Sequence, residues 1–138
     1  MERTIAYYIT ILQRHFRSYC QQELQQLGLS QGLLFFILYI GKHPQCSPKE
    51  LTNALHLDSG HVTRSLSKLE KSHFIQQTIN SNDKRARLLT LTKQGQNIFL
   101  KSHEFFYQWD QQIVENLTLV EQKQLLSLLQ KIQGGLSK

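Results

Sequence analysis

The stretch from Leu57 to Thr92 constrains the fold more than any other part of the chain, because an amphipathic helix there leads into a polar turn and a basic strand. Val62, Leu66, Leu69 and His73 recur at i, i+4, i+7 and i+11, which places them on one stripe of a helix. Small, polar and cationic residues occupy the opposite arc and its flank: Gly60, His61, Arg64, Ser67, Lys68 and Lys71. Such a helix buries one side in a core and offers the other side to a partner.

The start and the length of this helix suit the major groove of DNA. Asp58 or Ser59 is the expected N-cap, because either side chain can accept a hydrogen bond from a free backbone N–H. About fifteen residues that rise about 1.5 Å each give a rod roughly 22 Å long. A major groove about 12 Å wide admits a rod of that size.

Two short strands and a turn are expected after the helix. Phe74–Ile79 and Arg87–Leu91 are the predicted strands, and residues 80–84 form the turn between them, because Asn, Ser and Asp bond their own backbone there. Gln45–Ser47 is a candidate third strand. A helix followed by a hairpin with a polar, basic tip predicts a winged helix-turn-helix, a mainly α fold with a small β-hairpin wing.

Residues 83–95, which read Asp-Lys-Arg-Ala-Arg-Leu-Leu-Thr-Leu-Thr-Lys-Gln-Gly, resemble the wing signature of the MarR family. In that signature Asp-x-Arg is followed by Leu-Thr and then by Gly. Leu69-Glu70 and Phe74-Ile75 also match the family's exit from the recognition helix, whereas His73 stands where the family usually has glycine. The resemblance extends over essentially the whole chain, and it implies a dimeric transcriptional regulator, with repression as the expected action.

The predicted DNA contacts come from the helix and from the wing. The helical arc places Arg64 and Lys68 in the major groove. The resemblance implies that Arg85 reaches the minor groove from the wing tip, where Asp83 would hold the hairpin in shape. The full set of predicted DNA contacts is Ser59, Gly60, His61, Thr63, Arg64, Ser67, Lys68, Lys71, Asp83, Lys84, Arg85 and Arg87.

Positive charge is concentrated in the same region. The chain carries a formal net charge of +6. Residues 58–93 hold seven Lys or Arg against three Asp or Glu, a net of +4, and all other residues together carry only +2. A local basic excess on a helix and a wing is the electrostatic footprint of a phosphate-backbone partner.

Helical spacing predicts five further helices, at residues 2–27, 31–42, 48–55, 92–116 and 118–134. Ser30, Ser47 and Thr118 are the expected N-caps, and Glu50 and Glu121 complete capping boxes. The third of these helices should turn Leu51, Ala54 and Leu55 inward. Gly28 suits the end of the first helix, and Gly134-Gly135 the end of the last.

The predicted organisation is a single domain over residues 1–138. Residues 31–92 form the winged helix-turn-helix, and residues 92–116 form a long connecting helix. The helices at 2–27 and 118–134 carry apolar stripes that a monomer could not fully cover, and the resemblance implies that they interlock in a homodimer. A two-fold dimer sets two recognition helices about one DNA turn apart, which predicts a pseudo-palindromic double-stranded operator.

The sequence also indicates where the protein works. No signal peptide opens the chain, and the longest apolar run, Leu33–Ile40, is far shorter than the roughly 20 residues that span a bilayer. Cys20 and Cys46 lack a disulfide-framework spacing, as expected in a reducing cytosol. A cytoplasmic protein without a membrane partner is therefore expected.

Other functional classes have weaker support. No histidine pair has zinc-ligand spacing, and no phosphate-binding loop or nucleophile motif occurs, so neither a metal, another cofactor nor an enzyme is predicted. A winged-helix adaptor that binds only protein remains an alternative.

The resemblance also suggests a regulatory ligand, since family members commonly bind small aromatic or phenolic compounds. His15, Arg17, Tyr19 and Tyr39 are the candidate ligand-binding residues. The alternative is a redox switch at Cys46 or Cys20. Of the two thiols, Cys46 is expected to be the more exposed and Cys20 to be buried, and a helix N-terminus near Cys46 would lower its pKa.

Overall fold

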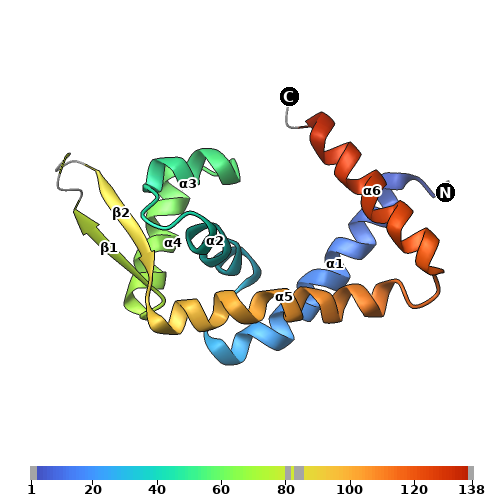
Figure 1. Cartoon of the computed structure of the whole chain (residues 1–138), viewed down its shortest axis with the longest axis horizontal. Helices are drawn as coiled ribbons and strands as arrows, with labels where there is room; N and C mark the ends of the chain where they lie inside the picture. Colours follow the sequence, from blue (N-terminus) through green and yellow to red (C-terminus); the bar gives the residue numbers. More distant parts are fainter. Residues whose placement is uncertain (1–2, 80–81, 83–85, 137–138) are drawn as a thin grey trace. The chain divides into compact units, whose positions relative to one another are not determined.

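The computed structural model describes residues 3–79, 82 and 86–136. These residues form six α-helices, one 3₁₀ turn and two strands, in the order α1 (Ile5–Leu24), η1 (Gln25–Leu27), α2 (Gln31–Lys42), α3 (Pro48–Leu55), α4 (Ser59–Lys71), β1 (Ile75–Ile79), β2 (Arg87–Leu91), α5 (Lys93–Ile113) and α6 (Leu119–Leu136) (Figure 1). The chain divides into two compact units, Met1–His103 and Glu104–Lys138. Helix α5 begins in the first unit and ends in the second.

Helix α2 lies at the centre of the core of the first unit. It starts where the Ser30 hydroxyl accepts a hydrogen bond from the Leu33 backbone N–H at 3.3 Å, as predicted. Five of its side chains are buried: Leu33, Leu34, Phe36, Ile37 and Ile40. A Cβ added at Gly41 would collide with the ring of Phe99, so the glycine is what lets α5 approach α2 closely.

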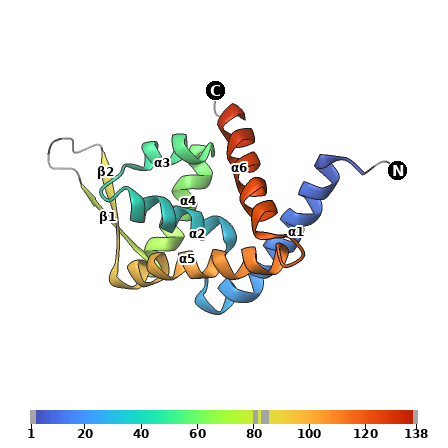
Figure 2. The same cartoon turned by 45° about the vertical axis from the view of Figure 1, so that its right-hand side comes forward.

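Helices α3 and α4 form the helix-turn-helix, and they pack against each other (Figure 2). The Ser47 hydroxyl accepts from the Glu50 backbone N–H at 3.1 Å, which begins α3 as predicted. Of the α3 residues predicted to face inward, Leu51 is fully buried. Ala54 is exposed, so the predicted inward position of Ala54 was wrong. His56 ends α3 in a left-handed conformation, with φ of +54°.

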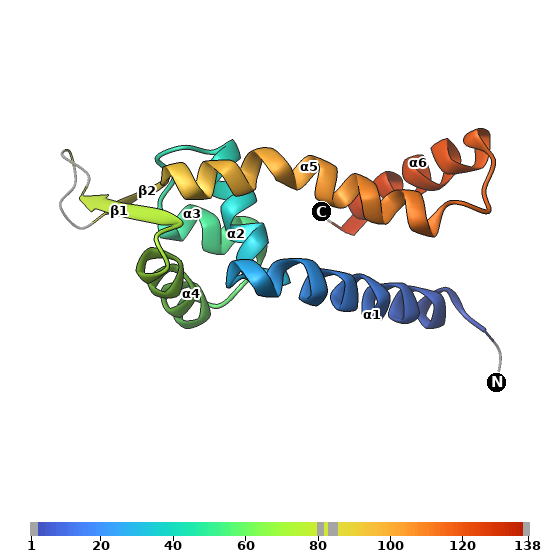
Figure 3. The ribbon, with the colours of Figure 1, turned by 90° about the horizontal axis from the view of Figure 1, so that it is seen from below.

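The wing is a two-stranded antiparallel sheet whose register runs from Ile75↔Leu91 to Ile79↔Arg87. Strand β2 has the predicted bounds, and β1 begins one residue later than predicted. The candidate third strand is reduced to a single bridge, Cys46↔Leu89. Figure 3 shows β1 leaving the end of α4 and running alongside β2.

His73 differs from the sequence prediction. It lies beyond the end of α4 and is exposed rather than on the buried stripe, and its φ is +66°. This left-handed conformation is the one that glycine adopts without strain, so it agrees with the glycine that the resemblance leads one to expect at this position. Only Val62, Leu66 and Leu69 of the predicted stripe are buried.

The second unit consists of the end of α5 and all of α6. Thr118 and Glu121 form the predicted reciprocal capping box, with the Thr118 N–H donating to Glu121 at 2.9 Å and the Glu121 N–H donating to the Thr118 hydroxyl at 3.2 Å. Helix α6 runs through Gly134-Gly135 to Leu136, so the glycines do not end it, and α5 ends at Ile113 rather than near residue 116. None of the apolar side chains described between residues 104 and 136 is buried.

The first predicted helix is α-helical from Ile5 to Leu24 and closes with the 3₁₀ turn η1, after which Gly28 adopts φ of +74°. Within the described ranges, no single helix is both long and apolar enough to cross a membrane. One pair, Ile5–Leu27 with Gln31–Lys42, meets that test jointly by length and composition, and it is bent by 74°.

Candidate nucleic-acid interface

Helix α4 begins at a side-chain cap. Asp58 Oδ1 accepts a hydrogen bond from the His61 backbone N–H at 2.8 Å, so Asp58 rather than Ser59 is the N-cap. This hydrogen bond lowers the pKa of Asp58, and the positive charge of Arg64 lowers it further. The carboxylate is therefore ionised at neutral pH, at the end of the helix where the dipole favours negative charge.

The two faces of α4 differ in burial and in charge. Val62, Leu66 and Leu69 are at most 2% exposed and belong to the core. The other face exposes Ser59, His61, Thr63, Arg64, Lys68 and Lys71, with Gly60 and Ser67 half-buried. All eight helix residues predicted as DNA contacts thus lie outside the buried stripe.

The outer face of α4 is a shallow groove with cationic and hydroxyl groups along it. Its lining residues are Thr63, Arg64, Ser67, Lys68, Lys71 and Ser72. The Thr63 hydroxyl donates to the Ser59 carbonyl oxygen at 2.9 Å. The His61 ring packs edge-on against Phe36, with ring centroids 6.3 Å apart, which ties the start of α4 to α2. Hydrogen-bond donors and positive charges on one rigid helix suit a phosphate-rich partner.

The wing adds one described cation to this surface. Arg87 is exposed at the start of β2, opposite Ile79. The other predicted wing contacts, Asp83, Lys84 and Arg85, lie outside the described residues. The structure therefore places nine of the twelve predicted DNA contacts, eight on α4 and one on the wing.

Glu70 has a contact that sequence reasoning did not find. Its Oε2 accepts a hydrogen bond from the Gln77 backbone N–H of β1 at 3.2 Å. The Leu69-Glu70 pair was recognised only as part of a family motif. The available signal was a carboxylate in the last turn of a helix, where the helix dipole disfavours negative charge.

The four candidate ligand-binding residues have different surroundings. Arg17 lines a cavity where α1 meets α2, together with Cys20, Gln21, Gln25, Leu29, Ser30, Gln31 and Gly32. Tyr39 stacks on His43, with ring centroids 4.2 Å apart. Tyr19 is a buried core residue, and burial raises its pKa, while His15 is exposed.

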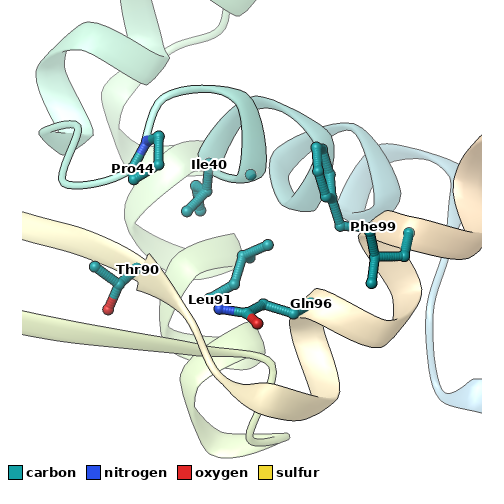
Figure 4. A pocket seen from close by; sticks show the side chains of 8 residues that line it. Ile40, Pro44, Thr90, Leu91, Gln96 and Phe99 are labelled. Atoms are coloured by element: carbon teal, nitrogen blue, oxygen red, sulfur yellow. The ribbon is translucent and has the colours of Figure 1, made fainter.

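A second cavity, of about 350 Å³, lies between the end of α2, β2 and the start of α5 (Figure 4). Figure 4 shows Ile40 and Leu91 pointing toward each other across it, with Gln96 and Phe99 at one side. Its lining residues are Ile40, Gly41, Pro44, Thr90, Leu91, Gln96, Phe99 and Leu100, none of which is ionisable. The guanidinium of Arg17 makes the α1–α2 cavity the better match for an anion.

Both thiols are buried. Cys20 is 1% exposed and Cys46 is 3% exposed, so Cys20 is buried as predicted and Cys46 is buried as well, rather than accessible as expected. The backbone of Cys46 pairs with Leu89 of β2 in an antiparallel bridge. Burial raises the pKa of each thiol from 9.0 to about 11. Among the described residues, no group of three or more His, Cys, Asp or Glu is placed to hold a metal ion.

Comparison with known proteins agrees with this arrangement. The family model described as "MarR family" matches residues 29–86. The chain is 46% identical over 132 residues to the HTH-type transcriptional regulator BilQ of Clostridium symbiosum, covering 96% of this chain and 92% of the relative.

Solved structures of MarR share the fold. A crystal structure of MarR superposes with a TM-score of 0.90 at 24% identity, covering 99% of this chain and 95% of that one. A cysteine-to-serine variant of MarR from Escherichia coli in complex with operator DNA superposes with a TM-score of 0.80 at 27% identity, covering 93% of this chain and 92% of that one. The chain therefore belongs to the MarR family of winged helix-turn-helix transcriptional regulators, which are DNA-binding proteins and not enzymes.

Proposed function

We propose that the protein is a repressor that binds a pseudo-palindromic double-stranded operator as a homodimer, with α4 in the major groove. The observation that carries this proposal is the division of α4 into a buried apolar stripe and an exposed cationic face. Arg64, Lys68 and Lys71 all lie on the exposed face. Thirteen residues of helix make a rod about 20 Å long, which a major groove admits.

Within this proposal, different residues have different roles. Arg64 and Lys68, along the middle and second half of α4, contact base edges, and Lys71 at its end contacts phosphate. Arg87 extends the positive surface onto the wing, and Arg85 reaches the minor groove, a role that rests on the family motif. The relative from Escherichia coli solved with operator DNA supports this mode of binding.

The homodimer is supported by apolar residues that the chain leaves exposed. In α1 the exposed apolar residues are Ile5, Tyr7, Tyr8, Ile9, Ile11 and Leu12, and in α6 they are Leu119, Val120, Leu125, Leu126, Leu128, Leu129, Ile132 and Leu136. Soluble monomers rarely expose so many large apolar side chains on two helices. A second copy would cover them and would set two α4 helices on one face of the DNA.

Release by a small aromatic or phenolic acid is the proposed regulation. The cavity beside Arg17 supports it, since the guanidinium can pair with a carboxylate or phenolate. A ligand there weakens DNA binding only by its differential affinity for two spacings of the α4 helices. Buried thiols of raised pKa make the redox alternative the less favoured one.

A gel-shift titration with the intergenic DNA beside the protein's own gene tests the DNA-binding proposal. Arg64→Gln and Lys68→Gln should each weaken operator binding, by about 1–3 kcal/mol where the side chain reads a base. Lys101→Gln is the matched control, because it removes the same charge from α5 and is exposed. If both α4 variants bind operator as tightly as the control, α4 does not read the DNA.

A promoter–reporter assay with and without the gene then decides between repression and activation. Salicylate added to the gel shift tests the effector. Release from the wild type but not from Arg17→Gln supports the α1–α2 cavity, whereas equal release from both places the ligand elsewhere. A peroxide-induced release that disappears in a Cys20→Ser, Cys46→Ser double variant would establish the redox alternative instead. A wild-type protein that binds no DNA but captures a protein partner would favour the adaptor.

A further inference from the structure

Glu70 places a negative charge where its own helix does not favour one. It is the second-to-last residue of α4, where the carbonyl end of the helix dipole disfavours a carboxylate. Its side chain instead reaches β1, where Oε2 accepts the Gln77 backbone N–H at 3.2 Å. The wing strand is thus bonded directly to the recognition helix.

The pairing of the wing shows why that N–H is available. Leu89 is the partner of Gln77 across the sheet. Both backbone groups of Leu89 are bonded on its other side, its N–H to the Cys46 carbonyl at 2.8 Å and its carbonyl to the Gln45 N–H at 2.9 Å. Gln77 and Leu89 therefore form a non-hydrogen-bonded pair, in which the backbone groups of each residue point away from the other strand.

One row of residues consequently crosses the wing and is held at both edges. The segment that precedes α3 holds β2 through Cys46, and α4 holds β1 through Glu70. We call this row, Cys46–Leu89–Gln77–Glu70, the wing clamp. Its β2 side consists of backbone bonds, whereas its β1 side depends on one side chain. Glu70 is the member of the clamp whose bond a substitution can remove.

We propose that Glu70 is a positioning residue, which fixes the wing relative to α4 so that both contact the same half-site. The proposal rests on the proposed function, since it concerns how the wing meets DNA. Holding the two elements at the right angle before binding lowers the cost of making contacts in neighbouring grooves at the same time. The clamp crosses the wing at the middle one of its five residue pairs, so it fixes the paired strands themselves relative to α4.

The hydrogen bond itself limits the size of the effect. For a neutral acceptor, such as the side-chain amide in Glu70→Gln, one such bond contributes a net of about 0.5–1.5 kcal/mol, which corresponds to a change of about 2- to 13-fold in an equilibrium constant. Glu70→Ala should therefore bind operator more weakly than Glu70→Gln by about that factor. A much larger loss would mean that Glu70 acts in some other way.

Glu70→Ala and Glu70→Gln separate the hydrogen bond from the charge. Both remove the carboxylate, and both introduce good helix formers. The amide oxygen of Gln can still accept the Gln77 N–H, while Ala cannot. Removing a negative charge near DNA strengthens binding equally in both variants, so the difference between them isolates the bond.

Two measurements on the full-length protein decide the proposal. Hydrogen exchange followed by NMR without DNA should show the Gln77 amide protected in wild type and Glu70→Gln, and less protected in Glu70→Ala. Operator binding should be about 2- to 13-fold weaker for Glu70→Ala than for Glu70→Gln. Thermal melts serve as the folding control. Both variants should melt well above the temperature of the binding assay, so that both are folded when binding is measured.

A second pair of variants, made in a protein whose wing carries no Lys or Arg, tests whether Glu70 acts by positioning the wing. With Lys84, Arg85 and Arg87 all changed to Gln, the Ala and Gln variants at Glu70 should bind operator equally, because no cationic wing contact remains to position. A difference that persists in this background shows that Glu70 acts without the wing, which overturns the proposal.

The remaining outcomes are equally decisive. Equal Gln77 exchange in all three proteins shows that the bond is absent in solution. Lost protection with equal operator affinity shows that the bond exists but does not position the wing. Failure of the wild type to bind any operator overturns the proposed function instead, and the exchange experiment then still reports on the bond.

Discussion

Gly95 lets the first turn of α5 lie against the backbone of Phe74, and a methyl group there should destabilise the protein. The first turn of α5 lies against the carbonyl of Phe74. The Thr92 N–H donates to that carbonyl at 3.0 Å, and the Thr92 hydroxyl accepts from the Gly95 N–H at 3.1 Å. A Cβ built on Gly95 would collide with the Phe74 carbonyl oxygen and would lie 3.3 Å from the Cβ of Leu91.

The expected cost of Gly95→Ala follows from what can move. A flexible side chain could rotate away from a new methyl group. The Phe74 carbonyl cannot, because it is part of the backbone segment that connects α4 to β1. Overpacking costs about 1–3 kcal/mol, and a weakened Thr92–Phe74 hydrogen bond adds about 1 kcal/mol. Alanine recovers about 1 kcal/mol through its higher helix propensity. The net expectation is destabilisation by about 1–3 kcal/mol.

Urea unfolding followed by circular dichroism at a fixed protein concentration measures this cost. Gly32→Ala is the matched control, since Gly32 lies in the first turn of α2 with nothing within 4 Å of an added Cβ. The control should be stabilised by about 0.5–1 kcal/mol through helix propensity alone. If Gly95→Ala is as stable as Gly32→Ala, the close approach of α5 to Phe74 is not a constraint on folding and the reasoning fails.

His73→Gly should raise the free energy of unfolding by about 0.5–1 kcal/mol in the same urea assay, because relief of a left-handed residue outweighs the added freedom of the unfolded chain. At pH 8, Ellman's reagent should label the native thiols at least tenfold more slowly than the urea-unfolded ones, because a rise in pKa from 9.0 to about 11 makes the thiolate fraction about a hundredfold smaller. Leu125→Asp with Leu129→Asp should shift sedimentation from dimer to monomer or aggregate, whereas Gln130→Asp should not; an unchanged dimer would place the interface elsewhere.

The sequence predicted the local signals that require only neighbouring residues. Ser30, Ser47, Asp58 and the Thr118–Glu121 capping box all begin helices where expected, because a cap is a contact across three residues. The bounds of α2 and β2 were also predicted. The buried stripe of α4 followed from helical periodicity up to Leu69, where the helix is about to end.

The errors occurred where distant residues decide the structure. Periodicity extended the helix to His73, whereas the start of β1 requires a left-handed turn there. Cys46 was expected to be accessible because it precedes a helix N-terminus, but it is buried, and its backbone pairs with Leu89, more than forty residues later. The bond from Glu70 to Gln77 likewise joins two secondary-structure elements, so no spacing rule within one helix could reveal it.

The exposed apolar residues of α6 link stability, assembly and DNA binding in the proposed dimer. Leu126, Leu128 and Ile132 are each more than half exposed in the single chain, so covering them with a second copy contributes free energy only when two chains meet. The stability of the protein should then rise with its concentration. The same association sets the distance between the two α4 helices, because each chain supplies one α4 and the proposed interface determines how far apart the two lie. A ligand can therefore change this distance without contacting α4, because the arrangement of the two chains in the dimer determines the distance.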